Sequence, residues 1–185
     1  MKSKIDITVF DNGEAAIMKA SLTGELWADY QAFARLAAKR REKNRFHAEK
    51  AARRYERAAS LSLFAFYETV LHRWLPHFAE QVDVQAFIDK PLAEKSRIVL
   101  LQVFPDAGKD QEFAHLWAIL ERYDLHNGAW LDALTGETLL DIAQSMDAFL
   151  SCIEQKSGLQ RFPACEASTD TLVSKLSSFF FHHVK

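Results

Sequence analysis

Cysteine, glycine and proline are all scarce in this chain. The shortage of cysteine excludes a small protein whose fold is held together by disulfide bonds. The 185 residues include two cysteines, six glycines and four prolines. Two cysteines, Cys152 and Cys165, provide no disulfide framework, so a hydrophobic core must hold the fold together. A chain of this length can bury such a core without disulfides or metals.

Long apolar runs are also missing. The longest, residues 61–67 and 178–181, fall well short of the roughly 20 residues that a helix needs to span a bilayer. The polar start, MKSKIDITVFDNG, does not resemble an export signal. We therefore expect a soluble cytoplasmic protein without a membrane partner, in a reducing compartment.

Common catalytic and cofactor motifs are absent from the sequence. It contains no Gly-x-Ser-x-Gly turn, no glycine-rich phosphate loop and no dinucleotide fingerprint. His72 and His77 lie on either side of Pro76, and His182 and His183 are adjacent, so neither pair has the i, i+4 spacing of metal ligands on a helix. We expect no cofactor and no metal.

The small net charge conceals one strongly basic segment. The net charge is −2, yet residues 39–57 carry nine lysines and arginines against three glutamates. Glu42, Glu49 and Glu56 recur every seven residues, and Glu49 with Arg53 has the spacing of an ion pair, which favours a solvated helix face. The alternative is a surface that binds the phosphates of RNA or another polyanion. Its candidate residues are Lys39, Arg40, Arg41, Lys43, Arg45, Lys50, Arg53, Arg54 and Arg57.

Hydrophobic periodicity predicts a mainly α fold, a helical bundle with a short N-terminal β-hairpin. Residues 5–10 alternate, and DNG at residues 11–13 is a hairpin turn signal. Apolar residues then recur every three or four positions from residue 26 to residue 75, with a break or exposed tip near Arg40, Arg41 and Asn44. Further helices are expected at residues 92–103, 111–123, 138–155 and 169–182. We interpret the chain as one domain, with the hairpin at 1–24 and the bundle at 25–185.

Glu68 is a single acid in the strongly apolar stretch LSLFAFYETVLHRWL. A carboxylate in such a setting needs a partner if it is buried. It either reaches the surface or orients an arginine or histidine from another helix, and the sequence leaves both interpretations open.

The stretch ERYDLHNG, residues 121–128, is the second candidate site. Arg122 and His126 are four apart and share one face of a helix. Together they offer a phosphate clamp and a proton carrier, the two needs of RNA cleavage through a 2′-hydroxyl. The simpler interpretation is structural, with both side chains complementing a helix C-terminus that Asn127 or Gly128 caps.

Taken together, RAASLSLFAFYETVLHRWL and LERYDLHNG resemble the HEPN superfamily, helical proteins of prokaryotic defence, toxin–antitoxin and RNA-processing systems. The resemblance covers roughly residues 26–153. It implies that Glu68, Arg122, Asp124 and His126 form a metal-independent RNA-cleaving site, and that the protein works as a homodimer.

The sequence departs from the family pattern in its register. Asn127 stands where the family histidine is expected, and His126 comes one residue early. Our first hypothesis is therefore a HEPN-like protein of a defence or toxin–antitoxin system, with a weak or vestigial RNase site and an RNA-binding surface. The alternative is a non-enzymatic helical module that binds a protein partner, such as an antitoxin or defence component.

Overall fold

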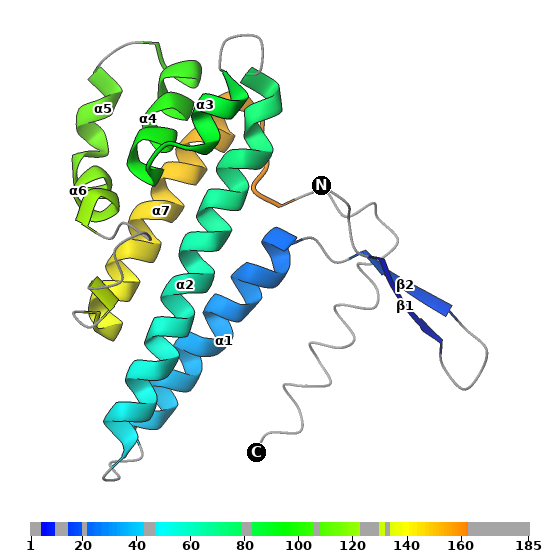
Figure 1. Ribbon diagram of the computed structural model, residues 1–185, viewed down its shortest axis with the longest axis vertical. Helices are drawn as coiled ribbons and strands as arrows, with labels where there is room; N and C mark the ends of the chain where they lie inside the picture. The colour runs from blue at the N-terminus through cyan, green and yellow to red at the C-terminus, as the bar shows by residue number, and fades with distance from the viewer. Residues whose placement is uncertain are drawn as a thin grey trace.

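Helices make up almost all of the part of the chain that the structure describes. The computed structural model describes residues 5–9, 15–19, 22–42, 47–78, 83–105, 108–122, 130–131 and 134–162. The mainly helical fold predicted from the periodicity is confirmed, and Figure 1 shows the helices as a bundle. In chain order the elements are β1 (Ile5–Val9), β2 (Ala15–Lys19), α1 (Leu22–Glu42), α2 (Ala48–Trp74), the 3-10 helix η1 (Leu75–Phe78), α3 (Val84–Ile88), α4 (Leu92–Val103), α5 (Gly108–Glu112), α6 (Ala114–Arg122) and α7 (Gly136–Ser157).

The two strands pair with each other. β1 runs antiparallel to β2, with Ile7 opposite Ile17. The predicted turn at residues 11–13 lies outside the described residues, so the hairpin stays a prediction of the sequence.

The two longest helices of the N-terminal half, α1 and α2, lie side by side and run in opposite directions (Figure 1). The chain turns between Glu42 and Ala48, close to the predicted break. Since neither helix contains an internal proline, and the one glycine of α1 lies in its first turn, each continues without interruption. The buried face of α2 repeats every three or four residues, at Ala52, Glu56, Ala59, Leu63, Tyr67, Val70 and Trp74.

The hydrophobic core lies among α2, α4, α6 and α7: α4 and α7 pack against α2, and α6 packs against α4 and α7. The ring of Phe149 from α7 is completely buried, with its centroid 5.9 Å from that of Tyr67 and 5.7 Å from that of Trp117. Aromatic edge-to-face contacts of this kind contribute about 1 kcal/mol each beyond the area that they bury. None of the helices in the described part of the chain has the length and apolar character needed to cross a membrane.

The bounds of one predicted helix agree with the structure, and those of another differ. Leu92–Val103 coincides with the expected helix, whereas the helix expected at 111–123 is divided at Phe113 into α5 and α6. There the backbone N–H of Phe113 and the indole N–H of Trp117 both donate to the carbonyl of Asp110, at 3.3 and 3.0 Å. The helix expected at 169–182 lies outside the described residues, and η1 and α3 were not predicted.

A side chain caps the start of α7, and a residue in a left-handed backbone conformation ends the helix. Thr135 Oγ1 accepts a hydrogen bond from the N–H of Thr138 at 3.2 Å, as an N-cap does. Gly158 ends the helix with φ of 74°, a left-handed conformation that favours glycine.

Candidate functional site

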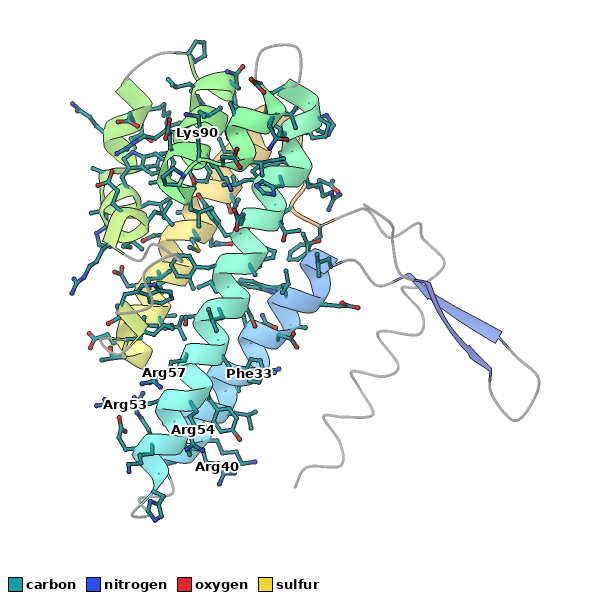
Figure 2. The ribbon with its side chains drawn as sticks, viewed as in Figure 1. Phe33, Arg40, Arg53, Arg54, Arg57 and Lys90 are labelled. Atoms are coloured by element: carbon teal, nitrogen blue, oxygen red, sulfur yellow. The ribbon has the colours of Figure 1, made fainter. Side chains whose placement is uncertain are left out.

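The most strongly charged surface lies where α1 ends and α2 begins. We call the cations there the basic tip: Lys39, Arg40, Lys50, Arg53, Arg54 and Arg57. Figure 2 shows Arg40, Arg53, Arg54 and Arg57 gathered at this end of the helix pair. All six side chains are exposed apart from Arg57, which is half-buried.

Most of the basic tip is not neutralised by neighbouring carboxylates. Arg53 donates to Glu49 at 3.1 Å, the ion pair predicted from their spacing. The side chains of Lys39, Arg40, Lys50 and Arg54 make no hydrogen bond or ion pair with any residue in the described part of the chain. Their charges are therefore available to an anion from solution.

Arg41 is held differently from its neighbours. Its guanidinium donates two hydrogen bonds to the carboxylate of Glu56, one of them from Nη2 to Oε2 at 2.9 Å. It also donates from Nε to Glu49 at 3.3 Å. The carboxylates of Glu56 and Glu49 stabilise the charged guanidinium and raise the pKa of Arg41 above its usual value. Hydrogen bonds from Arg41 and then Arg53 lower the pKa of Glu49.

The interpretation of Glu56 as part of a solvated face was wrong. Glu56 is 1% exposed, and the first residue of α7, Gly136, covers it. A Cβ atom added to Gly136 would lie 2.9 Å from Arg41 Nη1 and 3.0 Å from Glu56 Oε1. The ion pair of Arg41 and Glu56 therefore lies where the end of α1, the first half of α2 and the start of α7 meet. We assign Arg41 a structural role and leave it out of the basic tip.

Lys43 and Arg45, the remaining phosphate-binding candidates, lie outside the described residues.

Glu68 occupies a second cluster, at the opposite half of α2. Its carboxylate accepts a hydrogen bond from the ammonium group of Lys95 of α4, and His72 Nε2 lies 3.8 Å from the same oxygen. Lys95 is 3% exposed, whereas about a third of the Glu68 side chain reaches solvent. Glu68 thus reaches the surface, and the cation from another helix that it holds is a lysine, not the arginine or histidine that the sequence analysis considered.

His72 is the third residue of this cluster. Its Nε2 atom is buried without a hydrogen-bond partner among the described residues, and its ring lies against Phe87 at 5.8 Å. Burial, followed by the positive charge of Lys95, lowers the pKa of His72 below its usual value, and Glu68 opposes this only in part.

Sequence reasoning missed Lys95 as a buried cation. A signal was present, because Lys95 and Val99 are four residues apart and share the buried stripe of α4. A lysine on such a stripe predicts a buried carboxylate partner from another element. The neighbouring Ser96, also fully buried, shares a hydrogen bond of 3.0 Å with the hydroxyl of Tyr67.

Of the predicted cleavage residues, two lie outside the described part. Arg122 is the exposed last residue of α6, while Asp124 and His126 fall in the segment 123–129 that the structure does not describe. The partners that the structure gives to Glu68 are Lys95 and His72.

Comparison with family models, with curated proteins and with solved structures found no match for this chain. The HEPN resemblance therefore remains an expectation drawn from the residues themselves.

Proposed function

We propose that this protein binds RNA through the basic tip, as a HEPN-like member of a defence or toxin–antitoxin system. The observation that supports this is the set of four cations, Lys39, Arg40, Lys50 and Arg54, that have no carboxylate partner in the described part of the chain. Such cations release condensed counterions from a nucleic acid when they neutralise its phosphates, which favours binding at low salt.

The shape of the basic tip favours a backbone contact over the reading of bases. Lys50, Arg53, Arg54 and Arg57 are spaced by three or four residues, so they form one strip along α2, and Lys39 and Arg40 extend it onto α1. Cations on a convex helix end contact phosphates without enclosing a base. We therefore expect weak binding with little sequence preference.

Fluorescence anisotropy with a labelled single-stranded RNA tests the proposal. With up to six phosphates neutralised, the logarithm of the association constant is expected to fall with the logarithm of salt concentration with a slope of about −3 to −4. Arg54→Glu is expected to weaken binding about tenfold at low salt and to reduce the steepness of the slope by about 1.

Lys156→Glu is the matched control, because it makes the same charge change on an exposed residue near the end of α7, at the other end of the bundle (Figure 1). It is expected to leave affinity nearly unchanged. Equal losses in the two variants, or affinity that does not respond to salt, would contradict a localised phosphate-binding surface.

The second part of the proposal is that Arg122 and His126 form a weak or vestigial cleaving pair. The shift of the histidine to position 126 supports this, and so does the ion pair that occupies Glu68. We expect the protein to leave RNA uncut in the presence of EDTA. Cleavage under those conditions, with cyclic or 3′-phosphate ends and loss of activity in His126→Ala, would show instead that the pair is active.

One observation favours the alternative, a non-enzymatic module that binds a protein partner. Apolar side chains of α1 and α7 line a groove on the surface, and such a groove accepts an amphipathic helix.

A further inference from the structure

Phe33 of α1 and Tyr55 of α2 form an aromatic pair that is not fully covered by the bundle. Their ring centroids are 6.5 Å apart and their planes differ by 21°, so the two rings are nearly parallel. Both residues are half-buried, whereas the paired rings of Tyr67 and Phe149 in the core are completely buried. Part of the pair of Phe33 and Tyr55 is therefore open to solvent.

This aromatic pair lies beside the basic tip. Phe33 and Arg40 are seven residues apart on α1, so they share one face of that helix, separated by roughly 10 Å along its axis. Tyr55 directly follows Arg54 in the strip of cations on α2. Figure 2 shows Phe33 at the level of Arg57, with Arg54 and Arg40 closer to the end of the helix pair. The aromatic pair and the basic tip thus occupy the same end of the bundle.

Packing holds the two rings in place. α1 and α2 pack against each other, and Phe33 also contacts the edge of the hydrophobic core. Leu36 lies between Phe33 and Arg40 on α1 and is 38% exposed, which extends the apolar surface towards the cations. The Tyr55 hydroxyl makes no hydrogen bond within the part of the chain that the structure describes, so its ring is not positioned by that group.

A part-exposed aromatic pair beside cations suits a nucleic acid whose bases are unpaired. Every base has a flat π-face, so it can stack on an exposed aromatic ring whatever its identity. In a duplex the faces of the bases are covered by the neighbouring base pairs, and only phosphates and groove edges are accessible. Arg40 and Arg54, whose side chains have no partner among the described residues, are available to the phosphates of the same strand.

We propose that Phe33 and Tyr55 form a stacking platform for an unpaired base of a single-stranded RNA whose phosphates bind the basic tip. This assignment rests on the proposed binding of RNA by the basic tip, and it adds the form of RNA that the surface selects. Stacking does not read the hydrogen-bonding edges of a base, so it agrees with binding that has little sequence preference.

Fluorescence anisotropy with three labelled RNAs of equal length tests the proposal. The three are a single strand, the same strand with abasic riboses, and the corresponding duplex. The unmodified protein is expected to bind the single strand about tenfold more tightly than the abasic strand, which carries the same phosphates but no bases to stack.

Tyr55→Leu removes the ring but keeps an apolar side chain. It is expected to weaken binding of the single strand about fivefold and to leave binding of the abasic strand and the duplex unchanged, and Phe33→Leu is expected to do the same. Tyr55→Phe keeps the ring and is expected to retain the affinity. Circular dichroism of each variant shows that it remains helical.

Phe162→Leu is the matched control. Phe162 is also a part-exposed ring, 37% exposed and stacked on Phe66 at 5.7 Å, but it follows the end of α7, away from the basic tip. Its replacement is expected to leave binding of all three RNAs unchanged.

The outcomes separate failure of the platform from failure of the proposed function. Salt-sensitive binding of all three RNAs that is unchanged in Tyr55→Leu and Phe33→Leu would overturn the platform and leave the phosphate-binding surface standing. Equal weakening of all three RNAs by Tyr55→Leu would overturn it as well, because the ring would then support the basic tip and not a base. Absence of binding to any of the three RNAs would overturn the proposed function and the platform together.

Discussion

The ion pair between Arg41 and Glu56 makes the sharpest prediction about stability. Replacing Arg41 with methionine keeps most of the apolar stem but leaves a carboxylate that is 1% exposed without a counter charge. Removing one partner of a fully buried pair costs about 3–5 kcal/mol. Because 37% of the Arg41 side chain is exposed, water reaches the pair, and we expect Arg41→Met to lower the free energy of unfolding by about 2–3 kcal/mol.

Two further variants test the same reasoning. Glu56→Gln is expected to cost less, about 1 kcal/mol, because the guanidinium that it leaves behind can turn towards water. Gly136→Ala places a Cβ atom within 3.0 Å of the Glu56 carboxylate, so we expect it to lower stability although its backbone conformation is ordinary.

Urea unfolding provides the measurement and Arg40→Met the control. Arg40 is the exposed neighbour of Arg41 and makes no ion pair with the described residues, so its replacement is expected to change stability by less than about 0.5 kcal/mol. The effect on RNA binding is expected to be reversed: Arg40→Met should bind RNA more weakly than Arg41→Met does. Equal stability of the two variants would refute the structural role of Arg41.

Further predictions concern the second cluster and the end of α7. Glu68→Gln leaves the buried ammonium of Lys95 without a carboxylate and is expected to cost about 1–3 kcal/mol in urea unfolding, more than Lys95→Met, which leaves a carboxylate that reaches water. Because the pKa of His72 is lowered in the folded protein, the unfolded chain binds the proton more readily, so stability is expected to fall as pH drops below about 6.5. In thermal melts from pH 7.5 to 5.5, His72→Gln should reduce this dependence of stability on pH. His77→Gln, which replaces an exposed histidine, is the control and should not reduce it. The same change of stability with pH in both variants would contradict the effect of burial on His72. Gly158→Ala is expected to cost about 1 kcal/mol through backbone strain alone, since a Cβ atom there meets nothing within 4 Å, and an unchanged midpoint of unfolding would contradict this.

The sequence alone determined the mainly helical fold class. Leu63, Tyr67, Val70 and Trp74 are spaced so that only a helix places them together, and all four are buried. The ion pair between Glu49 and Arg53 was predictable for the same reason, because it depends on the geometry of one helix. The spacing of residues within one helix depends only on positions close together in the chain, so it can be read from a single sequence.

Tertiary structure decided which polar residues face water. Glu49 and Glu56 have the same residue type and are one heptad apart, yet Glu49 is exposed and Glu56 is buried. The difference arises because the start of α7, eighty residues later in the chain, covers Glu56 at Gly136. The partner of Glu68 was likewise supplied by α4. Such pairings depend on which segments meet in space, and because the cost of burying a charge is set by those neighbours, no spacing within one helix encodes it.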